Sequence, residues 1–126
     1  MQDLYIPATA TSPEVDFRFS ADRLSLVGES YPENAAAFYG PVLDALRAYL
    51  AQACGRDIEV NVELKYFNSS STKVLFNIFE LLHAATGAND VRLHWYYDEE
   101  DDTILEFGND LHEDFPEIRY IPMAVA

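Results

Sequence analysis

The chain has 126 residues, the length of a single domain that can bury one hydrophobic core. Apolar residues make up 49% of it and aromatic residues 13%, which excludes a disordered chain. Its 8 Lys and Arg against 22 Asp and Glu give a formal net charge of −14, and such a surface repels nucleic-acid phosphates and anionic lipids. We therefore expect no nucleic-acid partner and no membrane partner, and any protein partner should offer a basic patch.

The sequence predicts a cytoplasmic protein with one domain over residues 1–126. Its single cysteine, Cys54, cannot form an internal disulfide. Residues 1–5 lack the basic start and apolar stretch of a signal peptide, and no segment approaches the ~20 apolar residues of a membrane span.

The first elements predicted along the chain are short strands. Residues 1–13, with two prolines and several Ser and Thr, indicate an irregular lead-in in which 4–6 could form a short edge strand. Residues 15–19 and 23–27 are typical of two strands that form a hairpin around a turn at 20–22.

A helix should follow this hairpin. Ser30 and Glu33 have the spacing of a capping box, in which each side chain accepts from the other residue's backbone amide. The helix should end near Cys54, because Gly55 is a typical helix stop.

The clearest strand and the clearest helix come next. Strict alternation predicts a half-buried strand over residues 58–66. We expect its buried side to carry Ile58, Val60, Val62, Leu64 and Tyr66. The spacing of apolar residues then predicts a helix from Thr72 to about Thr86, with Gly87 at its end.

The last third of the chain predicts a strand, a helix and a strand. Residues 91–97 alternate as a second half-buried strand, a weaker helix should cover about 103–113, and 118–122 form the last strand. The acidic run 98–102 lacks the glycine and the spacing of an EF-hand loop. Because acidic side chains at a helix start complement the helix dipole, we interpret this run as a solvated helix entry.

These elements predict an α/β fold. Strands that are separated by helices pair in parallel through right-handed crossovers. Strands buried on both faces are continuous apolar runs, whereas these strands alternate, so one face of the sheet should be open to water. We expect a two-layer domain, with a four- to five-stranded mixed sheet and helices packed on one face.

The polar segment Asn68–Lys73, between the strand 58–66 and the following helix, is the leading candidate for a functional site. On the residues alone it is ordinary capping chemistry, with Ser69, Ser70 or Ser71 accepting from the free amides of the helix. The alternative is a hydroxyl displayed at a helix N-terminus, where amides and the dipole favour a phosphate. A phosphoserine would then be accommodated without unfolding the domain.

Catalytic and metal sites are only weakly indicated. Ser70 and Lys73 match the S-x-x-K spacing of penicillin-binding enzymes, but no K-T-G or S-D-N companion is present and the chain is short for that fold. His83, His94 and His112 are widely separated, and none belongs to an H-x-x-x-H motif. We therefore predict no metal ion and no cofactor.

Four segments carry a likeness to a known family: Gly28–Asn34, Tyr66–Lys73, Ile78–Leu82 and Trp95–Asp98. In these segments the chain resembles the SiaC family of biofilm-regulating phosphoproteins, whose domain is similar to the STAS domain of anti-sigma-factor antagonists. The likeness covers nearly the whole chain. It implies a STAS-like sheet with helices on one side.

The resemblance also implies a non-catalytic role in partner switching. Members of the family are phosphorylated by a dedicated Ser/Thr kinase and dephosphorylated by a metal-dependent phosphatase. Unphosphorylated, they bind and activate a diguanylate cyclase, which raises cyclic di-GMP. The family's phosphorylated residue follows the Asn of the turn motif, which implies Ser69 in this chain, with Asn68, Ser70, Ser71 and Thr72 as its shell.

Two other functions stay open at this point. One, of the same broad class, is an anti-sigma-factor antagonist that acts on transcription. The other is a small hydrolase that uses Ser70 with Lys73.

Overall fold

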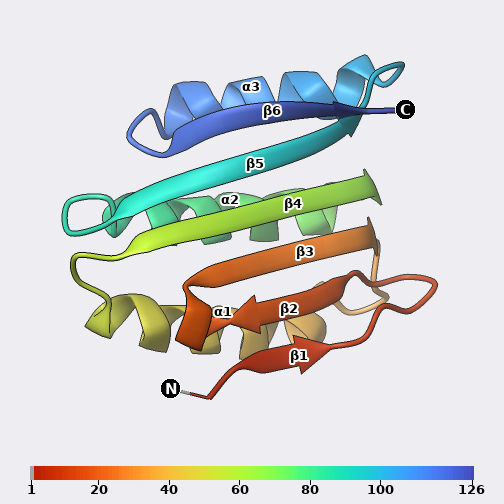
Figure 1. Cartoon of the computed structure of the whole chain (residues 1–126). Coiled ribbons are helices and arrows are strands. Elements are labelled where there is room, and N and C mark those ends of the chain that lie inside the picture. Colours follow the sequence, from red (N-terminus) through yellow and green to blue (C-terminus); the bar gives the residue numbers. More distant parts are fainter. Residues whose placement is uncertain (1) are drawn as a thin grey trace.

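The computed structural model describes residues 2–126, which form one six-stranded sheet, a short 3₁₀ turn and three α-helices (Figure 1). In chain order the elements are β1 (Leu4–Ile6), β2 (Glu14–Arg18), the 3₁₀ turn (Phe19–Ala21), β3 (Arg23–Ser30), α1 (Ala35–Gln52), β4 (Asp57–Phe67), α2 (Ser69–Ala84), β5 (Asp90–Asp98), α3 (Asp102–Asp114) and β6 (Arg119–Val125). The sheet in this part of the chain has more strands than the predicted four to five, because residues 4–6 do pair with β2.

The strands lie in the sheet in the same order as in the chain. The first two pairings, β1–β2 and β2–β3, are antiparallel, and the pairings from β3 to β6 are parallel. Each parallel step passes through one helix, and α1, α2 and α3 all lie on the same side of the sheet (Figure 1). The predicted α/β fold with two layers and one open sheet face is confirmed. No helix of residues 2–126 is long and apolar enough to cross a membrane.

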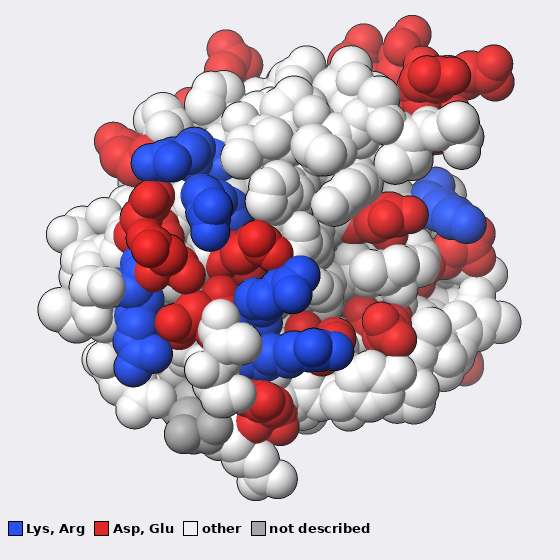
Figure 2. All heavy atoms as spheres, in the orientation of Figure 1, with Lys and Arg blue, Asp and Glu red and all other residues white. Residues whose placement is uncertain are grey.

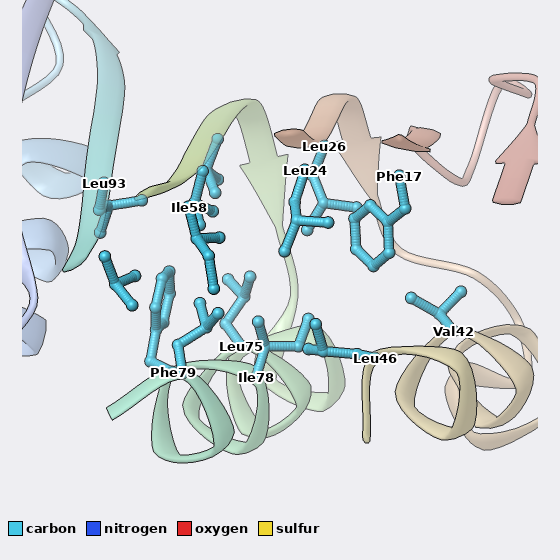
Figure 3. Packing of buried hydrophobic residues seen from close by; sticks show 14 of the residues in the cluster. Phe17, Leu24, Leu26, Val42, Leu46, Ile58, Leu75, Ile78, Phe79 and Leu93 are labelled. Carbon is cyan, nitrogen blue, oxygen red and sulfur yellow. The ribbon is translucent and has the colours of Figure 1, made fainter. Parts of the chain in front are cut away.

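The hydrophobic core lies between the helices and the sheet (Figure 3). The residues predicted to face each other across it are all buried: Ile58, Val60, Val62 and Leu64 on β4, and Val74, Ile78 and Leu82 on α2. Alternation along β4 and helical spacing along α2 therefore predicted this part of the core correctly.

Tyr66 departs from the predicted alternation, because 52% of its surface is exposed. The cause is a shift in the register between β3 and β4. Gly28 pairs with Leu64, but the next residue of β3, Glu29, pairs with Tyr66, so that Lys65 is an extra residue in β4. An extra residue of this kind is a β-bulge, which re-aims the side chains that follow it.

The bulge turns Phe67, and not Tyr66, towards the helices. The ring centroid of Phe67 lies 4.9 Å from that of Phe107 on α3. Because neighbouring residues of a strand point to opposite faces, Tyr66 lies on the open face. Opposite the bulge, Gly28 has a φ of 132°, a conformation that side-chain-bearing residues rarely adopt.

The starts of the first two helices also differ from the predictions. Ser30 does not cap α1, because it is still the last residue of β3 and is fully buried. The cap is Asn34, whose side-chain oxygen accepts from the amide of Ala37 at 3.0 Å. The helix α2 begins at Ser69, one turn before the predicted start.

The third helix is held close to β5 by Trp95. Its indole Nε1 donates to the carbonyl of Ile104 at 2.9 Å, and its ring stacks on Phe107 with the centroids 5.9 Å apart. A Cβ atom at Gly108 would lie 2.5 Å from the indole, so only glycine allows this approach. Through Phe107, this packing also supports Phe67, the residue at which β4 ends.

The open face of the sheet carries a row of charges that crosses five strands. Its members are register neighbours: Arg18, Arg23, Glu59, Arg92 and Arg119. Arg23 forms an ion pair with Glu59 at 3.1 Å. A hydrogen bond from Asn61 and the charge of Arg23 lower the pKa of Glu59. Figure 2 shows charges of both signs gathered over the end of the sheet where β4 begins.

Candidate functional site

The turn between β4 and α2 is organised by Asn68. Its side-chain oxygen accepts from the amide of Ser71 at 3.0 Å, and its carbonyl accepts from the amide and the hydroxyl of Thr72 at 2.9 and 3.1 Å. Its own amide donates to the carbonyl of Ser30 at 3.1 Å, which ties the turn to the end of β3. The interpretation of the three serines as caps is wrong, because the amide side chain of Asn68 does this work instead.

The turn brings all five predicted site residues together, but the four that carry a hydroxyl differ in exposure. Ser69 and Ser70 are exposed, Thr72 is half-buried, and Ser71 is fully buried. A modifying enzyme would therefore reach Ser69 and Ser70 without any rearrangement of the turn.

A buried chain of hydroxyl groups supports the turn from below. Ser30 Oγ donates to Ser71 Oγ at 2.7 Å and lies 2.5 Å from the hydroxyl of Tyr39 on α1. Because a hydroxyl has one proton to donate, Tyr39 is the donor to Ser30. Burial raises the pKa of Tyr39 above its ordinary value, so the phenol keeps this proton. The three residues join β3, α1 and α2 beneath the turn.

We predict that Ser30→Ala lowers the free energy of unfolding by about 1–3 kcal/mol. The substitution removes the central hydroxyl and leaves those of Tyr39 and Ser71 buried without their partner. Denaturant unfolding measures the loss, with the exposed Ser70→Ala as the matched control. An unfolding free energy equal to that of the control would show that the hydroxyl chain does not support the fold.

The start of α2 offers favourable surroundings for an anion. The first amides of a helix have no intrahelical acceptor, and here no acceptor in residues 2–126 bonds the amides of Ser69 and Ser70. Lys73, an exposed cation, follows Ser69 by four residues and so lies on the same face of the helix. A phosphate on Ser69 would meet the helix dipole and a lysine.

The other chemistry weighed from the sequence is not assembled in the described residues. No hydrogen bond joins Ser70 to Lys73, and no group of three or more His, Cys, Asp or Glu side chains in residues 2–126 could hold a metal ion. His83 pairs with Glu117, and His112 stacks on Tyr120.

The acidic run has the role predicted for it, that of a helix entry. Asp101 caps α3 by accepting from the amide of Ile104 at 3.1 Å, and Asp102 lies in the first turn of that helix.

A cleft of about 780 Å³ opens where β4 and β5 separate. Their pairing ends at Val62 and Trp95, although both strands continue, and the cleft is lined by residues such as Glu63, Lys65 and Tyr96. Ligands of open α/β sheets bind at the carboxyl ends of parallel strands. This cleft and the turn at Asn68 both lie at that edge.

The two-layer architecture, with its polar turn at the carboxyl edge of the sheet, places the chain in the class of small α/β domains with helices on one face of a mixed sheet. The profile of one family, described as SiaC family regulatory phosphoprotein, matches residues 6–123. The chain belongs to the SiaC family, as its resemblance indicated.

Relatives in Pseudomonas aeruginosa support this assignment. A protein of strain UCBPP-PA14 is 37% identical over 115 residues, which are 90% of each chain. The crystal structure of apo-SiaC from this species is 34% identical and has a TM-score of 0.89, over 98% of this chain and all of that one. SiaC is also seen as the activator in a complex with the diguanylate cyclase SiaD, with a TM-score of 0.90 and the same identity and coverage.

Proposed function

We propose that this chain is a non-catalytic, cytoplasmic adaptor of one domain that binds and activates a diguanylate cyclase. A Ser/Thr kinase phosphorylates Ser69 and releases the cyclase, and a metal-dependent phosphatase restores binding. The observation that carries this proposal is the similarity, over nearly the whole chain, to a SiaC protein that activates a cyclase. The exposure of Ser69 at the start of α2 supports it as the switch.

The surroundings of Ser69 explain why the fold should tolerate the phosphate. The modification adds about −1.5 to −2 charges at neutral pH. The dipole of α2 and the side chain of Lys73 offset part of this charge, and the bonds of Asn68 do not involve the Ser69 hydroxyl. The domain should therefore stay folded while the surface that it shows to a partner changes.

The binding surface should be less tolerant than the fold. A contact packed closely around a small neutral hydroxyl has no room for a phosphate, because that bulky and strongly hydrated group would have to give up its water there. Phosphorylation is thus expected to act on the complex and not on the free domain.

Measuring cyclic di-GMP synthesis tests the proposal. Purified unphosphorylated protein, added to the purified diguanylate cyclase of its own organism, should raise the rate of synthesis from GTP, and the same protein after heat denaturation should not. A cyclase rate that stays at its basal value at saturating protein, with no complex in sedimentation, would contradict the proposed function.

A further inference from the structure

Two exposed tyrosines form a pair beside the turn at Asn68. The ring centroids of Tyr31 and Tyr66 lie 5.6 Å apart in an edge-on arrangement, with an interplanar angle of 71°. Their exposed fractions are 36% and 52%, and they are two of the five large hydrophobic side chains exposed in residues 2–126. Edge-on aromatic rings attract each other, which favours this arrangement of the two side chains at the surface.

The backbone fixes this pair next to the proposed switch. The amide of Tyr31 donates to the carbonyl of Thr11 at 2.8 Å, and the residue before it, Ser30, accepts from the amide of Asn68. The β-bulge at Lys65 places Tyr66 on the open face, as argued above. Bulges often re-aim a side chain next to a functional site, and here the side chain is a large aromatic ring.

Carboxylates lie on the same face of the sheet as the pair. Glu29 is the register neighbour of Tyr66, and the exposed Val27 has Glu14 and Glu63 as its neighbours on the two adjoining strands. Lys65, the extra residue of the bulge, is the cation of this neighbourhood. Over the end of the sheet where β3 and β4 end, Figure 2 shows mostly uncharged atoms with separate red patches and a blue group, whereas charges of both signs are crowded together at the other end.

We infer that Tyr31 and Tyr66 are the anchor on which the output partner docks, and that the docking segment is basic with one apolar side chain. This inference rests on the proposed function. The apolar side chain covers the two rings and Val27, and the cations of the segment meet Glu29 and its acidic neighbours. Buried tyrosines at the centre of an interface, within a polar rim, commonly dominate its affinity.

The charge pattern is what selects a basic partner segment. The carboxylates around the pair outnumber the single Lys65, and the whole chain has a net charge of −14. Rim charges of this kind steer association and set its dependence on salt. The rings themselves supply apolar area whose contribution salt does not screen.

Binding of the purified diguanylate cyclase of the same organism, measured by titration calorimetry, tests the anchor. Tyr66→Ala should weaken binding roughly tenfold or more, whereas Tyr66→Phe should keep it, because the ring is retained. Met123→Ala is the control, since Met123 is also an exposed large apolar side chain, 38% exposed, but lies on β6 at the opposite edge of the sheet. Its binding should equal that of the wild type.

A second variant keeps the test independent of the tyrosines. Glu29→Lys changes an exposed side chain at the rim and should both weaken binding and reduce its dependence on salt. Equal cyclase binding by Tyr66→Ala, or by Glu29→Lys, would overturn the inference while the proposed function stands. A wild-type chain that does not bind the cyclase would instead contradict the proposed function. If Tyr66→Ala altered only self-association, the occupant would be a second copy, and the inference would be wrong.

Discussion

Incubation with the cognate kinase and ATP is expected to add one phosphate to Ser69 and to abolish cyclase binding and activation. Ser69 and Ser70 are the exposed hydroxyls of the turn, and Ser71 is closed off in the core, where its hydroxyl accepts from Ser30. The modified domain should keep its melting temperature within a few degrees, because the start of α2 accommodates the charge.

Single substitutions separate the switch from its neighbours. Ser69→Ala should bind the cyclase as the wild type does and ignore the kinase, and Ser69→Asp should bind poorly. Ser70→Ala, a control next in the chain and equally exposed, should remain fully switchable. Mass spectrometry of the kinase-treated protein identifies the modified residue. Phosphate found only on Ser70, Ser71 or Thr72, or a phospho-Ser69 protein that activates the cyclase undiminished, would contradict this mechanism.

Truncation of Ile78 should have the largest effect on stability. This residue is 3% exposed and lies on the face of α2 that packs on the sheet (Figure 3). Ile78→Ala should lower the free energy of unfolding by about 2–5 kcal/mol, through lost burial and the cavity that remains.

The neighbouring residue supplies the control for this truncation. Asn77 is exposed on the same helix, and Asn77→Ala should change stability by no more than about 0.5 kcal/mol. Denaturant unfolding of both variants gives the comparison. Two equal values would mean that α2 does not present Ile78 to the sheet, and the orientation of the turn at Ser69 would then need another explanation.

The fold was predictable where one periodicity ran without interruption. Alternation over 58–64 and helical spacing over 74–82 gave the correct faces of β4 and α2, because each side chain there is either in the core or in water. The edge strand β1 was only weakly indicated by the sequence. It has three residues and none of them is fully buried, so any alternation along it is too short to predict a strand firmly.

The details of the site were less predictable, because they depend on contacts between distant segments. Nothing in the order of residues 58–67 shows that Lys65 is an extra residue; this follows only from pairing with Gly28 and Glu29 on β3. The role of Ser30 was also misread. Its spacing to Glu33 fits a capping box, but its hydroxyl bonds Ser71, which is 41 positions away. The position of the turn at Asn68 was predictable from the sequence, whereas the buried chain of hydroxyl groups beneath it was not.

The two outer strands of the sheet affect how a partner can attach. An unprotected outer strand invites another chain to add itself through backbone hydrogen bonds, which leads to open-ended stacking and aggregation. On one side β1 has three residues, too few to template a long strand. On the other, β6 contains Pro122, which has no amide hydrogen to donate and is tolerated in sheets chiefly at such positions. Both edge strands therefore discourage strand addition, which leaves association with a partner to contacts between side chains.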